Sequence, residues 1–239
     1  MIDKLTRGTE SVLFPAVLTV ITIIVFSITD LDIYIQDYFY SANNGWIFDF
    51  HQKNTLAHWL YYKLPKLIVI LTGCYYLVKA IAYLIEHIRH KENLTPEKRK
   101  KDLYILSVMI AIPSIVGIIK SQSNVPFPYK LARYGGIEPH ITAFKAFSGE
   151  KLKSGERYKG WPGGHASAGF ALMGLAFCVA DKKKRLQRIL LVTAFGFYMG
   201  MGHTVDGNHF FSHNLISYYI ALMLSAGLYK IMKLEDKNG

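Results

Sequence analysis

The sequence predicts an all-α protein, a bundle of six transmembrane helices that forms one integral-membrane domain over residues 1–239. Hydrophobic residues make up 51% of the chain and charged residues only 19%, whereas a soluble protein carries about a quarter charged residues. The apolar residues also gather in six runs, most of them close to the roughly 20 residues that cross a bilayer as a helix. No cleavage site follows the first run, so we expect it to remain as an anchor.

The six predicted spans follow one another along the whole chain. The last two are the least apolar, because polar and histidine residues stand at their facing ends. The predicted spans are residues 11–29, 66–86, 103–119, 164–180, 189–202 and 209–232.

The loops between the spans separate into two kinds by charge. Lysine and arginine gather in the two terminal tails and in the loops 87–102 and 181–188. Because basic loops remain on the cytoplasmic side of a membrane, we predict that these loops and both termini are cytoplasmic. The loops 30–65, 120–163 and 203–208 then face outward.

One outward loop departs from this charge pattern. Residues 120–160 hold eight Lys and Arg residues against three glutamates, although positive charge outside opposes the topology signal. One interpretation is a solvated basic loop that touches anionic lipid. The other is an anion site, and phosphate is the anion that Lys and Arg bind best. The net charge of +11 could also indicate nucleic acid, but the basic residues lie mostly between apolar runs, so we predict no nucleic-acid partner.

Chemically active side chains stand at the outward ends of four predicted spans. They are Lys120 at the end of the third, His165 at the start of the fourth, His203 after the fifth and His209 at the start of the sixth. We expect these ends to meet in a pocket at the membrane surface. Gly163 and Gly164 precede His165, and free backbone N–H groups at such a helix start can bind phosphate.

His209 and His213 are four residues apart, which predicts that they share one face of a helix. This spacing suits a pair of zinc ligands, for which His203, Asp206 and His165 could complete the set. It also suits a nucleophile beside the group that orients it. Because the basic loop would repel a cation, we favour the anion site and predict neither a metal nor a cofactor.

Three stretches in the second half of the chain resemble, in order, the motifs of the type 2 phosphatidic acid phosphatase superfamily. The motifs of that family read Lys-x6-Arg-Pro, Pro-Ser-Gly-His and Ser-Arg-x5-His-x3-Asp. The matching stretches are residues 120–128, 162–165 and 202–213. The resemblance implies a six-helix membrane enzyme that acts on lipid phosphates.

The chain departs from these motifs at four positions. Phe127 stands at the first-motif arginine, and Gly163 at the second-motif serine. His203 and His213 stand at the third-motif arginine and aspartate. A bacterial branch that includes lipid A phosphatases is similar to this variant, with Pro-Gly-Gly-His, Arg-Tyr-Gly-Gly and His-Phe-x-Ser-His. Arg133 begins such an Arg-Tyr-Gly-Gly stretch, and the resemblance implies that it replaces the missing first-motif arginine.

The implied chemistry is covalent phosphoryl transfer without a metal or cofactor. The resemblance implies that His209 attacks phosphorus and forms a phosphohistidine. His165 then protonates the leaving alcohol and later activates water, while His213 accepts the other ring N–H of His209. The residues implied to bind the phosphoryl oxygens are Lys120, Arg133, His203 and Gly164.

The implied substrate is a membrane lipid phosphate, and the implied location is a bacterial inner membrane with the active site facing the periplasm. Lipid A, phosphatidylglycerol phosphate, phosphatidate and polyprenyl pyrophosphate are all open as substrates, and so is the oligomeric state. One alternative is a phosphotransferase that passes the phosphoryl group to another lipid. A second is a non-catalytic protein that binds anionic lipid through a decayed site, which the lost arginines support.

Overall fold

The computed structural model describes residues 11–48, 56–89, 95–147, 149 and 151–234. Over these residues the chain is mostly helical, which confirms the all-α prediction. The amino-terminal residues 1–10, the centre of the basic loop 87–102 and residues 235–239, all predicted to be cytoplasmic, lie outside the described residues.

The helices of the chain range from single turns to long helices. They are α2 (Leu13–Ile28), α3 (Leu31–Asp37), α4 (Leu56–His58), the π-helical turn η1 (Trp59–Lys63), α5 (Leu64–Ile88), α6 (Pro96–Ser123), the single turns η2 (Pro128–Lys130) and η3 (Ala132–Tyr134), α7 (Ala143–Phe147), α8 (Gly164–Phe170), α9 (Met173–Phe177), α10 (Lys182–Val205) and α11 (Phe211–Ile231). A short antiparallel hairpin joins β1 (Tyr40–Ser41) to β2 (Gly45–Trp46).

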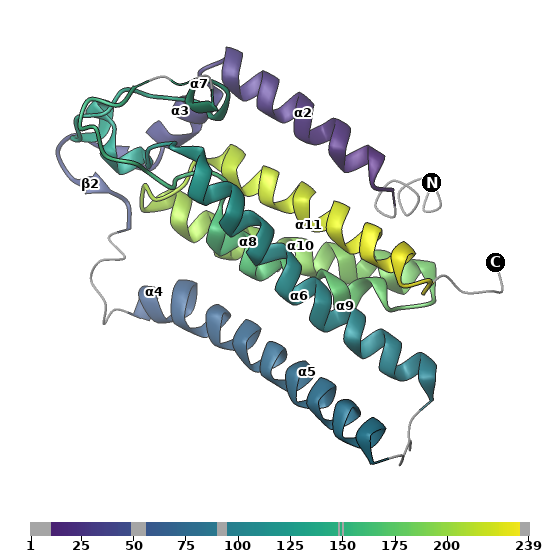
Figure 1. Cartoon of the computed structure of the whole chain (residues 1–239). Coiled ribbons are helices and arrows are strands. Elements are labelled where there is room, and N and C mark those ends of the chain that lie inside the picture. Colours follow the sequence, from purple (N-terminus) through teal and green to yellow (C-terminus); the bar gives the residue numbers. More distant parts are fainter. Residues whose placement is uncertain (1–10, 49–55, 90–94, 148, 150, 235–239) are drawn as a thin grey trace.

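The helices form one bundle with a cap of short elements at one end (Figure 1). The α8–α9 segment lies in the bundle between α6, α10 and α11 and packs against all three. Helix α2 packs along α11, and α5 packs along α6 on the opposite side of the bundle. The cap contains α3, the hairpin and α7.

Two glycines allow α8 and α10 to approach each other closely. A Cβ atom at Gly169 would lie 2.7 Å from the Cα of Gly196, and one at Gly196 would lie 2.1 Å from the ring of Phe170. Small residues at a helix interface let the two backbones come into contact. This contact sets the depth at which α8 presents His165 and α10 presents His203.

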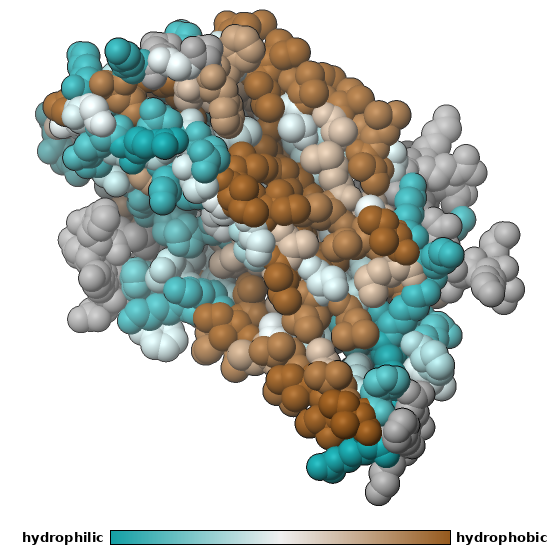
Figure 2. Space-filling view, viewed as in Figure 1, coloured by the Kyte–Doolittle hydropathy of each residue, from teal (hydrophilic) through white to brown (hydrophobic). Residues whose placement is uncertain are grey.

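Within the part of the chain that the structure describes, two helical segments are long and apolar enough to cross a membrane. They are Trp59–Ile88 and Pro96–Lys130, and a third crossing results if α2 and α3, which meet at a bend of 74°, form one span. An apolar band also crosses the visible face between more hydrophilic ends (Figure 2). Such apolar helices are typical of a membrane protein, whereas the six-span bundle remains a prediction.

Helices occur at all six predicted spans, but several boundaries differ from the prediction. Helix α6 begins at Pro96 and α10 at Lys182, so residues 96–102 and 182–188 are helical and not loops. Asp181 starts α10 early because its side chain accepts the backbone N–H of Lys184 at 2.7 Å. The predicted span 164–180 is two shorter helices, α8 and α9, which end at Phe177.

The predicted boundaries at the capped end were also wrong. Helix α6 continues to Ser123, so Lys120 lies in its last turn, and α10 continues to Val205. Helix α11 begins only at Phe211, because Phe210 has an extended conformation with φ −72° and ψ 160°. His209 therefore precedes the helix, and the prediction that it shares a helix face with His213 was wrong.

Candidate active site

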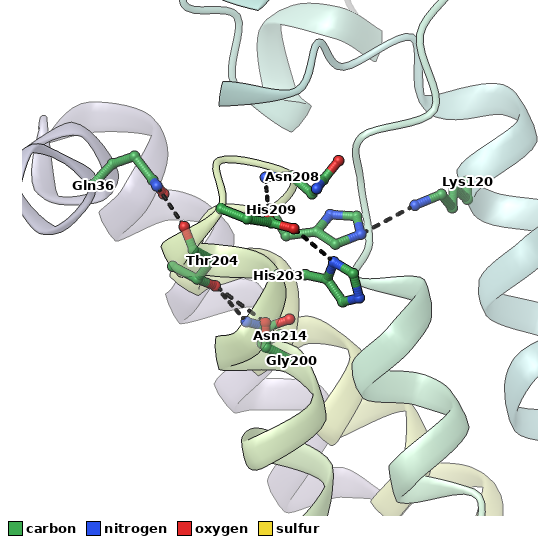
Figure 3. A network of polar contacts seen from close by, with 9 residues as sticks. Gln36, Lys120, Gly200, His203, Thr204, Asn208, His209 and Asn214 are labelled. Carbon is green, nitrogen blue, oxygen red and sulfur yellow. Dashed lines mark hydrogen bonds and ion pairs between the residues drawn. The ribbon is translucent and has the colours of Figure 1, made fainter. Parts of the chain in front are cut away.

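Side chains from the ends of four helices meet below the cap. The Nζ atom of Lys120 lies 3.4 Å from Nε2 of His209 (Figure 3). The ring of His165 stacks on that of His203 with the centroids 3.6 Å apart, and it lies 6.4 Å from the ring of His209. The structure thus brings together the four side chains that the sequence places at four helix ends.

The turn between α10 and α11 holds His209 beside His203. The backbone N–H groups of Asn208 and His209 both donate to the carbonyl oxygen of His203, at 2.9 and 2.8 Å. Gly207 has φ +78°, and a Cβ atom there would lie 2.4 Å from the ring of Trp46. This turn therefore requires glycine both for its conformation and for the space under the hairpin.

Gly163, which stands at the second-motif serine, is explained by its contact with α11. A Cβ atom at this position would lie 2.6 Å from Oδ1 of Asn214, so a serine would collide with that side chain. The Gly163 N–H donates to the carbonyl of His213 at 3.0 Å, and the Ser217 hydroxyl donates to the Gly163 carbonyl at 2.9 Å. These bonds fix the start of α8, and with it His165, against α11.

Polar contacts also hold the start of α11 in place (Figure 3). The Asn214 amide donates to the hydroxyl of Thr204 at 3.0 Å, and the Gln36 amide donates to the Thr204 carbonyl at 2.6 Å. The buried carboxylate of Asp32 accepts the backbone N–H of Ser212 at 3.0 Å and its hydroxyl at 2.5 Å. A carboxylate at a helix N-terminus stabilises the helix, so α3 fixes the segment that carries His209.

His209 has the properties of a nitrogen nucleophile. It is 2% exposed, and burial, aided by the nearby charge of Lys120, lowers the pKa of His209 well below its ordinary value. A histidine with a lowered pKa is neutral at neutral pH, so one ring nitrogen has a free electron pair. Because Nε2 faces Lys120, that nitrogen can attack an anion bound by the lysine.

His213 does not make the hydrogen bond to His209 that the resemblance implies. The two rings meet edge to face with their centroids 5.8 Å apart. The Nδ1 atoms of both rings are buried, and neither has a hydrogen-bond partner among the described residues. The imidazole of His213 also interacts with the backbone of Gly160. The hydrogen bond between the two imidazoles does not form because His209 precedes α11, so its ring does not lie on the helix face that carries His213.

Arg133 is engaged by an aspartate of the cap. Its Nε and Nη2 atoms donate to Oδ1 and Oδ2 of Asp37 at 2.8 and 2.6 Å, and the Tyr134 hydroxyl donates to Asp37 at 3.0 Å. The Arg133 side chain is 57% exposed. This paired contact holds η3 against α3. We therefore expect Arg133 to stabilise the cap, whereas the resemblance implies that it binds phosphate.

Lys120 and Gly164 face the same space. A Cβ atom at Gly164 would lie 3.6 Å from Nζ of Lys120, so the start of α8 and the ammonium group are neighbours. The ring of Phe127, at the position of the first-motif arginine, lies 5.6 Å from the same Nζ and 6.1 Å from the ring of His209. An aromatic ring thus lines the site where the family motif has a cation.

Sequence patterns did not single out Tyr62. Its ring lies 5.4 Å from that of His165 and 5.7 Å from that of His203, and no motif marks this position in η1. Asp206 was considered only as a zinc ligand, whereas its Oδ2 lies 3.2 Å from Nδ1 of His203. Among the described residues, no group of three His, Cys, Asp or Glu side chains has the arrangement of a metal site.

Comparison with known proteins identifies the family. The family model of the PAP2 superfamily matches residues 102–237, which is more than half of the chain, and the chain therefore belongs to this superfamily. Membership supports phosphatase or phosphotransferase activity on phosphate esters. Neither a search of curated proteins nor a search of solved structures finds a match.

Proposed function

We propose that the protein is an integral-membrane phosphatase that removes phosphate from a lipid headgroup through a phosphohistidine on His209. The observation that supports this most directly is the 3.4 Å approach of Nζ of Lys120 to Nε2 of the buried His209. The ammonium group of Lys120 can hold a phosphoryl group next to the neutral imidazole of His209, within reach of its Nε2 atom.

In the first step, Nε2 of His209 attacks phosphorus while the bond from phosphorus to the leaving oxygen breaks. His165 gives its proton to that oxygen, and the 6.4 Å between the rings of His165 and His209 leaves room for the phosphoryl group. Lys120, His203 and the Gly164 amide hold the phosphoryl oxygens. In the second step, His165 takes a proton from water, and the water oxygen attacks phosphorus while the phosphorus–nitrogen bond to His209 breaks, so inorganic phosphate is released and His209 is restored. No metal takes part in either step.

We further propose that the cap and the histidine cluster face the periplasm of a bacterial inner membrane. The apolar exterior of α5 and α6 supports a position in the bilayer, and a lipid substrate can then bring its phosphate to the capped end while its acyl chains remain among lipids. Reporter fusions after residues 95 and 145 should report opposite sides of the membrane. Equal signals from both fusions would contradict this topology.

A panel of lipid phosphates tests the activity. Detergent-solubilised protein should release inorganic phosphate from at least one of lipid A, phosphatidylglycerol phosphate, phosphatidate or polyprenyl pyrophosphate. We expect this release to continue after treatment with a strong chelator. Loss of activity that zinc restores would show that the histidines bind a metal instead.

Two histidine variants test whether phosphate release by the protein depends on His209. His209→Ala should abolish phosphate release, whereas His87→Ala, which changes a histidine in the last turn of α5, should retain it. If label from the lipid appears in a second lipid and not in free phosphate, the protein is a phosphotransferase. If neither product forms with any lipid of the panel, the proposed function is wrong, and a protein that binds anionic lipid without turnover is the alternative that remains.

A further inference from the structure

A second lysine lies close to the histidine cluster. Lys66 stands in the first turn of α5, and the start of this helix lies at the capped end of the bundle (Figure 1). The Nζ atom of Lys66 lies 5.3 Å from the centre of the Tyr62 ring. The Tyr62 ring meets those of His165 and His203 at 5.4 and 5.7 Å. One aromatic ring thus contacts both the lysine and the two stacked histidines.

The two lysines near the cluster differ in the histidines that they approach. The Nζ atom of Lys120 lies 3.4 Å from Nε2 of His209, and among the described residues Lys120 is the lysine whose charge acts on that ring. His165 is within range of both lysine charges. In the proposed reaction, His209 attacks from one side of phosphorus and the leaving oxygen departs on the opposite side, beside His165. Lys66 therefore lies on the side of the leaving group.

The contact with Tyr62 holds Lys66 only weakly. The side chain of Lys66 is exposed, and no carboxylate of the described residues pairs with it, whereas Lys79 of the same helix pairs with Asp102. A contact between an exposed ammonium group and a ring is weaker than a charge-assisted hydrogen bond to phosphate. The ammonium group of Lys66 can therefore leave the ring for a phosphate oxygen within reach of its flexible side chain.

We propose that Lys66 binds a second phosphate group on the leaving-group side of His165, so that the preferred substrate is a lipid diphosphate. This inference rests on the proposed function and narrows its substrate class. Lys120 holds the terminal phosphoryl group beside His209, and Lys66 donates to an oxygen of the phosphate that is attached to the lipid.

The reaction of a diphosphate follows the same two steps. Nε2 of His209 attacks the terminal phosphorus while the bond from that phosphorus to the bridging oxygen breaks. His165 gives its proton to the bridging oxygen, and the lipid monophosphate leaves. Water then attacks the phosphohistidine, which releases inorganic phosphate and restores His209.

The charge of Lys66 contributes most when the bond to the bridging oxygen breaks. Negative charge then develops on this oxygen and on the phosphate to which it belongs, and a cation placed there stabilises the transition state more than the bound substrate. A lipid monophosphate instead releases an alcohol, which offers Lys66 no phosphate oxygen. The two classes of substrate should therefore depend differently on this lysine.

The test compares two substrates that share one prenyl chain. Farnesyl diphosphate and farnesyl monophosphate differ only in the second phosphate, and initial rates of phosphate release give kcat/KM for each. Lys66→Gln should lower kcat/KM for the diphosphate about 10-fold, within what one hydrogen bond to a charged group contributes. The ratio of this value to kcat/KM for the monophosphate should fall with it. Lys66→Arg, which keeps the charge, should retain most of the ratio.

Lys63 is a matched control in the preceding turn. Its Nζ atom lies 5.4 Å from the ring of Trp59, so this lysine also contacts an aromatic ring one turn before it. The Trp59 side chain is 50% exposed and belongs to the exterior of the bundle. Lys63→Gln should leave both kcat/KM values within about twofold of wild type, as expected for an exposed charge away from the site.

A binding measurement separates the contact with phosphate from any effect of Lys66 on the acid His165, because binding needs no proton transfer. Methylenediphosphonate carries two phosphonate groups on one carbon and cannot be cleaved as a diphosphate is. It should raise the Tm of the wild-type protein more than inorganic phosphate does at the same concentration. This difference should be lost in Lys66→Gln and kept in Lys63→Gln.

Two results would overturn the inference. One is a folded Lys66→Gln protein with the wild-type kcat/KM for the diphosphate, and the other is a ratio that changes only because the monophosphate reacts faster. If Lys66→Gln does not fold, Lys66→Met, which keeps an unbranched side chain, takes its place in both measurements. Failure to release phosphate from any lipid, diphosphates included, contradicts the proposed function itself.

Discussion

Removal of the Lys120 charge should reduce turnover strongly. A phosphoryl oxygen held by Lys120 next to His209 lies about 4 Å from the ammonium charge, where two unit charges attract by about 4 kcal/mol at an effective dielectric constant of about 20. A preorganised donor of this kind typically contributes about 3–4 kcal/mol to the transition state. We therefore expect Lys120→Ala to lower kcat by about 10²- to 10³-fold, because Nζ lies only 3.4 Å from Nε2 of His209, the proposed nucleophile.

The assay is release of inorganic phosphate from the best lipid of the panel, measured beside thermal unfolding in the same detergent. Lys130→Ala is the matched control, because this lysine also belongs to the basic segment 120–160 but lies against the rings of Tyr129 and Tyr158. It should change kcat less than about twofold. A Lys120→Ala enzyme that is folded and within twofold of wild type would refute the assignment of Lys120 to the phosphoryl group.

Three further predictions concern the cap and the nucleophile. Arg133→Ala and Asp37→Ala should each lower thermal stability slightly and by similar amounts, since an exposed ion pair contributes little. Both variants should reduce turnover by less than about 10-fold. A loss of turnover near 100-fold in Arg133→Ala alone would instead show that this arginine binds phosphate. Glu138 accepts the N–H groups of Lys153 and Ser154 at 2.8 and 3.1 Å, and although burial acts in the opposite direction, these bonds lower the pKa of Glu138. The ionised Glu138 carboxylate should therefore stabilise the folded state at pH values above the ordinary pKa of glutamate, and this stabilisation should be lost as the pH falls through the lowered pKa. Glu138→Gln should accordingly lower Tm by about 2–4 °C at pH 7 and by less at pH 3. Equal losses of Tm at both pH values would contradict this. Because the pKa of His209 is lowered, its neutral form persists under mild acid, and the acid limb of kcat/KM should lie well below pH 6.5, roughly the ordinary value for histidine; a limb near that value would show that His209 is not the titrating nucleophile.

The helices and the histidine cluster could be predicted because their signals are local. Apolar runs mark helices, and the glycine pair before His165 marks the start of α8, which the structure confirms at Gly164. The first residues of α10 and α11 were harder to predict. The side chain of Asp181 caps the start of α10, and the extended backbone of Phe210 delays the start of α11. Neither effect changes the hydrophobic pattern of the sequence.

The contacts that refine the site could not be predicted, because they join segments far apart in the chain. Tyr62 approaches His165 from η1, more than a hundred residues earlier, and Asp32 fixes the start of α11 from α3. The same holds for Arg133, since the resemblance implies that it binds phosphate but the sequence does not indicate that Asp37 of α3 binds it. Asp206 is close to His203 in sequence, yet only the fold of the turn shows that its carboxylate faces the imidazole.

The proposed mechanism requires that phosphorus becomes covalently bound to His209. Incubation of the His165→Ala variant with a labelled substrate that has a good leaving group should trap the intermediate, because phosphorylation then needs no acid while water activation is impaired. After an alkaline quench, which preserves a phosphorus–nitrogen bond, mass spectrometry should find the label on the peptide that contains His209, and none when His209→Ala is added. Label on another residue, or the same label in the His209→Ala protein, would contradict the mechanism.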